Sequence, residues 1–239
     1  MKSATGMRQV GNPREKMSYI LTALSGICGQ LALGVYYSGV LIPEQPRMGS
    51  LTTSQLMEFI AHNRVSIFWD AYMQSIGTLL SVIFFIRLVY LSGSARRFAG
   101  WMVMITSSVI LAIALLDVTF TVAAVNAALA AHTDTMHVAV DFITGSTEAF
   151  DYTFLFVPAP LLIISLAFVI LDGALLPRIF GYMAIVIGIA FVVIGVVSLF
   201  NTLAGPGGIA FEMVQLIQVI WVLASAVFLL IYSQKKFKP

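Results

Sequence analysis

Residues 100–130 read GWMVMITSSVILAIALLDVTFTVAAVNAALA, an apolar stretch with no lysine or arginine and a single acid, Asp117. A bilayer has a hydrocarbon core about 30 Å thick, which a helix crosses with roughly 20 mostly apolar residues. At 1.5 Å per residue, Asp117 would lie about 25 Å from the first residue of this stretch. The stretch therefore predicts a transmembrane helix that carries a carboxyl group deep in its outer half.

Similar apolar stretches recur along the whole chain. Of its 239 residues, 59% are hydrophobic and 10% are charged, whereas soluble domains carry about 25% charged residues. This composition excludes a soluble domain and predicts an all-α fold, a polytopic integral membrane helix bundle that forms a single transmembrane domain over residues 1–239. The six expected transmembrane helices cover residues 17–42, 65–91, 100–130, 150–171, 181–203 and 210–232.

The basic residues indicate how this bundle is oriented. Of the 13 lysine and arginine residues, only Arg47 and Arg64 lie on the side reached after the first span. Lysine and arginine accumulate in cytoplasmic loops, and six spans return the chain to the side where it began. We therefore expect both the N- and C-termini to be cytoplasmic. The formal net charge of +2 then reflects orientation and contact with anionic lipids, not nucleic-acid binding.

Two segments between the spans have the apolar spacing of short helices. Residues 51–62 begin with threonines that can cap a helix, followed by apolar residues three and four positions apart. Residues 136–148 have a similar composition, and we expect both segments to form outer-surface helices that cap the bundle. Pro158 and Pro160 are expected to kink the fourth span.

Polar side chains gather in the outer halves of several expected spans. Asp70 and Gln74 are one turn apart on one helix face, and Thr121 follows Asp117 at the same spacing. An aspartate at the centre of a span costs about 2.5–3.5 kcal/mol on insertion scales, so such residues usually face protein or water. The pattern predicts an outward-facing polar cavity with ligand-binding residues Asp70, Gln74, Asp117, Thr121, Asp151, Glu212 and Gln215.

The same residues also allow a purely structural interpretation. Amides and protonated carboxyl groups form hydrogen bonds between transmembrane helices, and we expect this role for Gln30 in the first span. Asp151 and Glu212 lie near the ends of spans, where a charge among the lipid headgroups costs little. The acids can therefore be helix contacts and nothing more.

A metal site is the third interpretation. If the loop after the third span is helical, His137 and Asp141 are one turn apart, a spacing that suits a shared Zn²⁺, and His132 precedes them. The chain lacks a His-Glu-x-x-His pair, and exposed loop histidines are commonly solvated. No cofactor is assigned, because there is no phosphate-binding glycine loop and one cysteine cannot form a thiolate cluster.

Three further features form a pattern: residues 54–62 running into Arg64, the Pro177-Arg178 turn leading to Gly181, and a last span with Trp221 and a basic tail. In these features the chain resembles a large uncharacterised bacterial family of small multi-span integral membrane proteins, defined only as a domain of unknown function. The resemblance implies an inner-membrane protein of six or seven helices. It implies no catalytic residues.

Three classes of function follow from these observations. The first is a protein whose outward-facing cavity binds or transports a small cation, a proton or an amphipathic molecule. The second is a non-catalytic accessory or structural subunit that packs against another membrane protein or a second copy of itself. The third, and least favoured, is a metal-dependent membrane enzyme. In every case membrane lipids are the expected partners, and nucleic acid is not.

Overall fold

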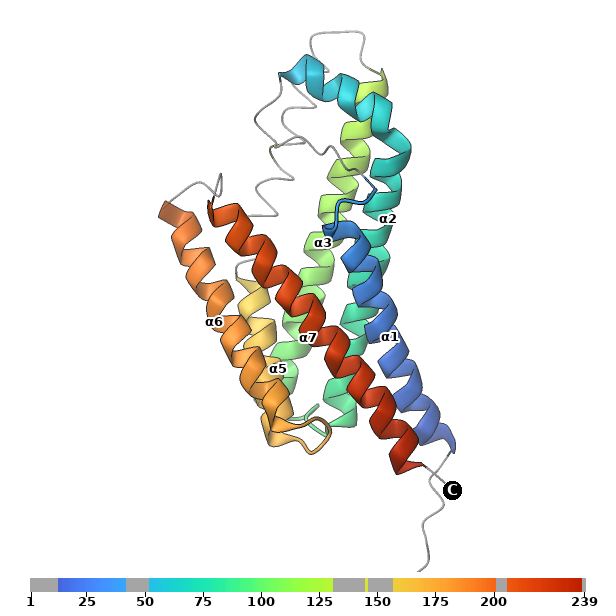
Figure 1. Cartoon of the computed structure of the whole chain (residues 1–239), viewed down its shortest axis with the longest axis vertical. Helices are drawn as coiled ribbons and strands as arrows, with labels where there is room; N and C mark the ends of the chain where they lie inside the picture. The colour runs from blue at the N-terminus through green and yellow to red at the C-terminus, as the bar shows by residue number, and fades with distance from the viewer. Residues whose placement is uncertain (1–12, 42–51, 131–144, 146–156, 201–205, 238–239) are drawn as a thin grey trace, which may run out of the picture.

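The structure, a computed structural model, describes residues 13–41, 52–130, 145, 157–200 and 206–237. Within these ranges it contains helices and no strand, which confirms the predicted all-α class. The helices are α1 (Pro13–Tyr37), α2 (Thr53–Leu91), α3 (Phe98–Ala130), α5 (Pro158–Asp172), α6 (Arg178–Phe200) and α7 (Pro206–Lys236) (Figure 1).

Most of these helices are long enough to cross a bilayer. By length and composition, five of them qualify as membrane spans, and α5 is shorter at 15 residues. A crossing takes roughly 20 apolar residues. The fourth expected span, 150–171, includes residues 150–156, which lie outside the described residues. The apolar helices are consistent with an integral membrane protein.

The helices form a closed ring in which each one packs against two neighbours. The order around the ring is α1, α2, α3, α5, α6 and α7, and α7 packs against α1 again. Lys236 Nζ at the end of α7 lies 2.8 Å from Glu15 Oε1 at the start of α1. The first and last described helices therefore have these ends on the same side of the bundle, as Figure 1 also shows.

The interior of the ring is packed with large apolar side chains from different helices. Phe84 on α2, Leu162 on α5, Phe191 on α6 and Trp221 on α7 are all fully buried. Trp221 Nε1 also donates a hydrogen bond of 3.0 Å to the backbone oxygen of Phe180 on α6. Lipid is as apolar as these side chains, so close packing and hydrogen bonds between helices hold such a bundle together.

Two glycines let α1 and α2 approach each other closely. A Cβ atom placed on Gly77 would lie 3.0 Å from the backbone oxygen of Gly29 and 3.0 Å from the backbone nitrogen of Leu33. A Cβ atom on Gly29 would lie 2.9 Å from the backbone nitrogen of Ser81. Small residues permit such close contact between membrane helices. This contact fixes the position of α1 residues relative to Ser81 on α2.

The segment 51–62 is helical from Thr53, but the prediction of a separate surface helix is wrong. Thr52 forms a capping box with Gln55, and the helix then continues without a break to Leu91. Ile60 and Ile67 on this part of α2 pack against Val125 and Ala128 near the end of α3. Packing against α3 thus extends the second span outward.

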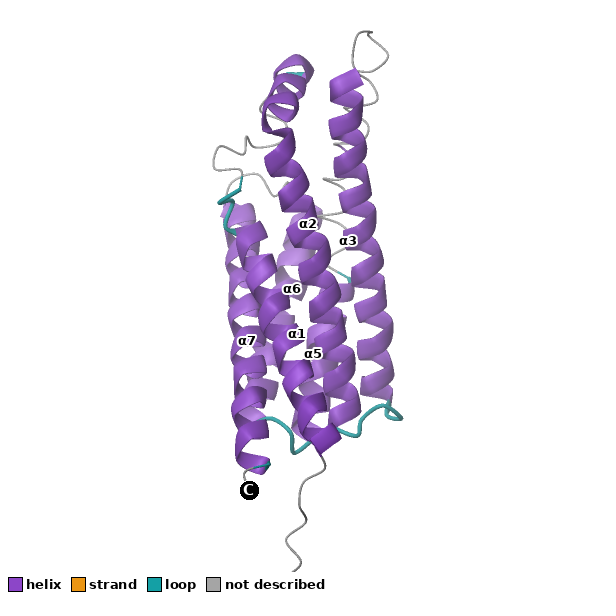
Figure 2. Ribbon diagram, turned by 90° about the vertical axis from the view of Figure 1, so that its right-hand side faces the viewer, coloured by secondary structure: helices purple, strands orange, loops and turns teal. Residues whose placement is uncertain are grey.

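Both α2 and α3 are longer than a bilayer crossing requires. At 39 residues, α2 is roughly 58 Å long at 1.5 Å per residue. Figure 2 shows that the upper ends of α2 and α3 project beyond those of α6 and α7. The other expected surface helix, 136–148, lies outside the described residues except for Gly145.

The two prolines begin α5, so the predicted kink within the fourth span is wrong for the described helix. Pro158 is its first residue, and Pro160 is in its first turn. A proline is tolerated there because backbone N–H groups of the first turn have no partner within the helix.

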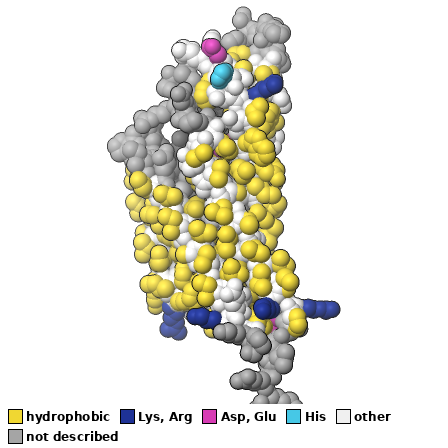
Figure 3. Space-filling model, turned by 45° about the vertical axis from the view of Figure 1, so that its right-hand side comes forward, with side chains coloured by type: hydrophobic (Ala, Val, Ile, Leu, Met, Phe, Trp, Pro, Cys, Tyr) yellow, Lys and Arg dark blue, Asp and Glu magenta, His cyan; other side chains and the backbone are white. Residues whose placement is uncertain are grey.

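The outer surface of the bundle suits a lipid environment. Figure 3 shows hydrophobic side chains over the middle of one face, and lysine and arginine side chains mainly at its lower end. At the end that carries Lys236, Arg97 Nη1 lies 3.2 Å from Asp172 Oδ2 between α3 and α5. The charged groups of this end are thus separated from the broad apolar belt.

Candidate functional site

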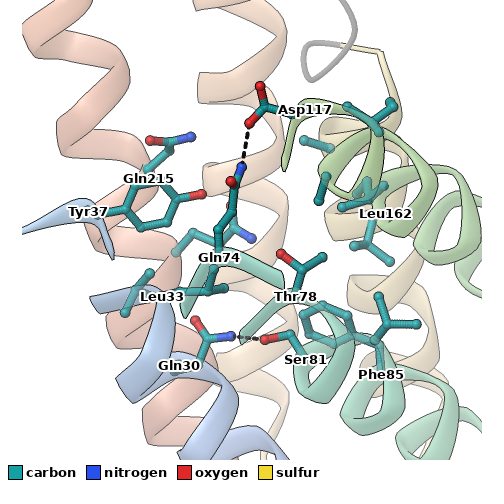
Figure 4. Close-up of a pocket in the computed structure, with 17 residues that line it drawn as sticks. Gln30, Leu33, Tyr37, Gln74, Thr78, Ser81, Phe85, Asp117, Leu162 and Gln215 are labelled. Carbon is teal, nitrogen blue, oxygen red and sulfur yellow. Dashed lines mark hydrogen bonds between the residues drawn. The ribbon is translucent and has the colours of Figure 1, made fainter. Parts of the chain in front are cut away.

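A cavity of about 90 Å³ lies inside the ring of helices. Because roughly 10–15 Å³ is enough for one water molecule, the cavity has room for several waters or a small organic molecule. Its lining comes from α1, α2, α3, α5 and α7, and none of its lining residues belongs to α6. Figure 4 shows this arrangement. The polar lining residues are Gln30, Tyr37, Gln74, Thr78, Ser81, Asp117, Gln215 and Gln218.

Asp117 and Gln74 form one end of the cavity. Gln74 Nε2 on α2 donates a hydrogen bond of 2.8 Å to Asp117 Oδ2 on α3. Asp117 is only 3% exposed, and its second oxygen, Oδ1, has no hydrogen-bond partner among the described residues. The carboxyl group is therefore fixed by one oxygen and has an unused acceptor at the other.

Gln30 and Ser81 form the other end. Gln30 Nε2 on α1 donates a hydrogen bond of 2.7 Å to Ser81 Oγ, and this hydroxyl donates in turn to the backbone oxygen of Gly77 at 2.7 Å. Gln30 is also 3% exposed, and its Oε1 atom lacks a hydrogen-bond partner in the described part of the chain. This end of the cavity thus presents a neutral acceptor.

Unfilled acceptors of this kind are unusual in a folded protein. A buried polar group without a partner costs about 1–3 kcal/mol, and most such groups are satisfied by protein or ordered water. Here two of them, Asp117 Oδ1 and Gln30 Oε1, belong to residues that line the same cavity, and both atoms are themselves shielded from solvent.

The described lining of the cavity carries one ionisable acid. Among the described residues that line the cavity, Asp117 is the only acid, and none is lysine, arginine or histidine. An ionised Asp117 would therefore lack a cationic partner within this lining. The arrangement is complementary to a species with one positive charge.

The third polar side of the cavity comes from α7. Gln215 and Gln218 are three residues apart, which places them on neighbouring positions of one helix face. In Figure 4, Gln215 and Tyr37 lie on the side of the cavity opposite Leu162. Glutamine amides can donate or accept hydrogen bonds, so this side of the cavity can bind either a hydrogen-bond donor or an acceptor.

The structure brings together only part of the predicted site. Gln74, Asp117 and Gln215 line the cavity, whereas Asp70 and Thr121 do not. Asp70 is one turn before Gln74 on α2, Thr121 is one turn after Asp117 on α3, and both are partly exposed. Glu212 belongs to α7, but its side chain lies outside the described residues, as do Asp151, His132, His137 and Asp141.

Other residues of the cavity were not predicted as ligand-binding residues. Gln30 was expected to join helices only, and it does so through Ser81, but it also lines the cavity. Ser81 and Thr78 were not singled out at all. Serine and threonine are common in membrane helices, so their presence in the sequence does not mark a site. The close contact between Gly29 and Gly77 determines which side of α2 faces α1.

The described residues give the metal interpretation no support. They contain no group of three or more histidine, cysteine, aspartate or glutamate side chains placed to hold an ion. Cys28 on α1 is exposed. The residues predicted to bind zinc, His132, His137 and Asp141, all lie outside the described ranges, so this interpretation stays a prediction.

Comparisons of the chain with protein-family models, with curated proteins and with solved structures gave no match. The fold and the cavity together define a class: a helical membrane protein with a small polar cavity inside its bundle. The resemblance to a bacterial family of membrane proteins stays a prediction.

Proposed function

We propose that the protein binds or transports a small cation in this cavity, with Asp117 as the counter-charge. One observation supports this function above all. Asp117 is buried in the helix ring and held by Gln74 through one oxygen, while its other oxygen has no hydrogen-bond partner among the described residues. Aspartates within membrane spans are costly and typically mark ligand or ion pathways.

The surroundings of Asp117 favour a cation over an anion or a purely apolar ligand. Burial opposes the carboxylate form of Asp117, and the hydrogen bond from Gln74 favours it, since charge-assisted hydrogen bonds are stronger than neutral ones. None of the described residues that line the cavity is basic, so none of them neutralises that charge. A bound cation would supply the opposite charge.

The cavity lies far from the basic end of the bundle. Asp117 is about 28 Å along α3 from Phe98, and Gln215 is about 31 Å from Lys236 along α7, at 1.5 Å per residue. Both residues are therefore far from the end of the bundle that carries Arg97, Asp172 and Lys236. If the basic end is cytoplasmic, the cavity lies in the outer half of the bundle.

The Asp117→Asn variant tests this function. We expect Na⁺, K⁺ or methylammonium to raise the thermal stability of the wild-type protein in nanodiscs at constant ionic strength, because a ligand that binds the folded state stabilises it. A ligand at 100 times its Kd adds about 2.7 kcal/mol. Asp117→Asn should abolish this stabilisation while preserving the folded state, since the amide keeps the shape of the side chain without the charge.

Asp172→Asn is the matched control. Asp172 is an aspartate of the same bundle, but it pairs with Arg97 at an exposed end, away from the cavity. This variant should respond to cations as the wild type does. A cation response that survives Asp117→Asn, or that is absent from the wild type for all three cations, would contradict the proposed function.

A second candidate is an accessory or structural subunit, favoured by the hydrogen bonds that the cavity residues form between helices. Gln30 joins α1 to α2, and Gln74 joins α2 to α3. If these groups only hold helices together, Asp117→Asn should match the wild type in every cation assay. Stability should then fall only when the side chain loses its polar atoms, as in Asp117→Leu.

We also propose that both ends of the chain are cytoplasmic and that the protein is located in a bacterial inner membrane. Basic residues at the end of the bundle that holds Glu15 and Lys236 support this orientation. A fluorescent protein fused after residue 239 should fluoresce, and alkaline phosphatase at the same site should be inactive. Alkaline phosphatase inserted within residues 43–51 should be active, and the reverse pattern would contradict the orientation.

A further inference from the structure

We propose that the cavity opens between α1 and α7 toward the hydrocarbon of the bilayer, and that it binds a single-chain amphiphile with a small neutral head group, such as a hydroxyl group. The alkyl chain of this ligand would pass between the two helices into the lipid. This inference goes beyond the proposed function, because it requires no charge on the ligand or on Asp117. It draws on the exposure of the lining residues and on two glutamine amides.

The cavity begins where the close contact between α1 and α7 ends. Near the basic end, Lys236 pairs with Glu15, and toward the middle of the bundle a Cβ atom on Gly26 would lie 2.8 Å from Ala226 Cβ. Every lining residue of α1 follows Gly26, and every lining residue of α7 precedes Ala226. Figure 1 shows the two helices farther apart at their upper ends than at their lower ends. The cavity therefore occupies the part of this seam where the helices separate.

The lining residues are exposed on this side of the cavity. Those on α2, α3 and α5 are all buried except Ile110, which is partly exposed. On α1, Leu33 is partly exposed and Tyr37 is exposed. On α7, Gln218 and Val219 are partly exposed. Apart from Ile110, the accessible part of the wall thus belongs to α1 and α7, which locates the opening between these helices.

The opening is at the level of the lipid hydrocarbon. Both α1 and α7 are long and apolar enough to be membrane spans. Gln218 is about 27 Å along α7 from Lys236, at 1.5 Å per residue, within the roughly 30 Å of a hydrocarbon core. Large apolar side chains near this level, Leu31 on α1 and Ile217 and Ile220 on α7, are exposed. A ligand can therefore reach the cavity sideways from the half of the bilayer farther from the basic end.

Two glutamine amides on α7 supply the polar contacts for a head group. No hydrogen bond joins the side chain of Gln215 or Gln218 to another described residue. Gln215 is only 8% exposed, yet its amide atoms are not among the shielded polar atoms, which include Asp117 Oδ1 and Gln30 Oε1. The Gln215 amide is therefore open to the cavity. Because buried amides normally have hydrogen-bond partners, these two favour a ligand that supplies them.

The side chains at the opening suit an alkyl chain. Leu33 on α1 and Val219 on α7 line the cavity on this side. A chain that starts at the amide of Gln215 and passes between these two residues has apolar neighbours until it reaches the lipid. Ligand pockets typically combine apolar walls with a few placed polar groups that fix orientation. The amides are neutral and can both donate to and accept from a hydroxyl group. These features match a single-chain alcohol.

Photolabelling with a diazirine derivative of octanol tests the site on the full-length protein in nanodiscs. We expect mass spectrometry to find the label mainly within residues 31–37 of α1 and 215–222 of α7. Excess octanol should remove this labelling. From butanol to octanol, the aqueous concentration needed for half displacement should fall about fourfold per CH₂ group, because the chain stays in apolar surroundings. An octanol that displaces less well than butanol would indicate a closed cavity and overturn the proposal.

Val219→Trp narrows the opening, and Ile220→Trp is the matched control. The two positions are adjacent on α7, but Val219 lines the cavity, whereas Ile220 does not and is exposed. Val219→Trp should abolish the labelling that octanol displaces. Ile220→Trp should retain it. Circular dichroism of both variants shows whether the helices are intact.

Variants of the amides test the head-group contact even if Val219→Trp does not fold. Gln215→Met and Gln218→Met keep the length of the side chain and remove its hydrogen-bonding groups. Each should raise the octanol concentration needed for half displacement about two- to twelvefold, the range expected for one net hydrogen bond. Their helix content should stay unchanged, since neither amide is bonded to another described residue. Displacement at the wild-type concentration in both variants would contradict the contact.

The outcomes distinguish this inference from the proposed function. Labelling spread evenly over the lipid-facing side chains, or equal displaceable labelling of the wild type and Val219→Trp, would overturn the inference. Displaceable labelling that persists in Asp117→Asn, with no cation response in the wild type, would support the inference and contradict cation binding. A cation response without displaceable labelling would support cation binding and overturn the inference.

Discussion

Replacing Trp221 with alanine should lower the free energy of unfolding by about 3 kcal/mol. Trp221 is only 2% exposed and belongs to the apolar core inside the ring. In water-soluble proteins, truncating a buried aromatic residue to alanine costs about 3–5 kcal/mol. We expect the lower end of that range because lipid removes the water-driven part of the loss, while the cavity and the lost contacts remain.

The hydrogen bond of Trp221 adds to this effect. Its Nε1 atom donates to the backbone oxygen of Phe180, so the alanine variant also leaves this acceptor without its indole partner. Trp221→Phe keeps most of the volume and loses only the donor, and it should cost about 1 kcal/mol. Unfolding in mixed micelles with increasing SDS, followed by circular dichroism, measures both changes.

Trp101 provides the control for the tryptophan series. It lies on α3 and is 57% exposed, so its truncation creates no cavity inside the ring. Trp101→Ala should change the free energy of unfolding by less than about 0.5 kcal/mol. Equal losses for Trp101→Ala and Trp221→Ala would show that the interior of the ring does not determine stability.

Replacing Gly77 with leucine should damage both the fold and the cavity. Even the first atom of the new side chain would lie 3.0 Å from the backbone oxygen of Gly29, and backbone atoms cannot move aside as a flexible side chain can. Overpacking of this kind typically costs about 1–3 kcal/mol, occasionally more. Because α1 must shift away from α2, the hydrogen bond between Gln30 and Ser81 should also break.

Gly34 on α1 allows the same substitution without a clash. A Cβ atom there would have no neighbour within 4 Å. Gly34→Leu should therefore be neutral or slightly stabilising, since glycine is the weaker helix former by about 1 kcal/mol relative to alanine. SDS unfolding and cation titration of the two variants make the comparison. A Gly77→Leu protein with wild-type stability and binding would contradict the close contact.

The sequence predicts the helices of this protein better than their ends. Runs of apolar residues are long enough to identify the spans, because a bilayer crossing requires that length. The first residues of α2 and α5 are determined by local features that a hydropathy pattern does not report. Thr52 and Gln55 cap α2 well before the apolar run begins, and Pro158 starts α5 inside it.

The site was partly predictable for a related reason. Asp117 and Gln74 are identifiable because polar groups in the outer halves of spans are costly and need partners. Asp70 and Thr121 are on the same helix faces as Gln74 and Asp117 but lie one turn away. Helical spacing predicts which residues share a face, but it does not predict how far along that face the cavity extends. Gln30 required knowledge that α1 packs closely on α2, which depends on Gly29 and Gly77.

The closed ring also has a consequence for the order of assembly. Among the described helices, five of its six contacts join helices that follow one another, but α1 packs against α7, the last of them. At this seam, Tyr19 contacts Tyr232 and Phe237, and Gly26 lies against Ala226. During synthesis α1 leaves the ribosome before α7, so the surface of α1 that packs against α7 must contact lipid or a chaperone until α7 has been made.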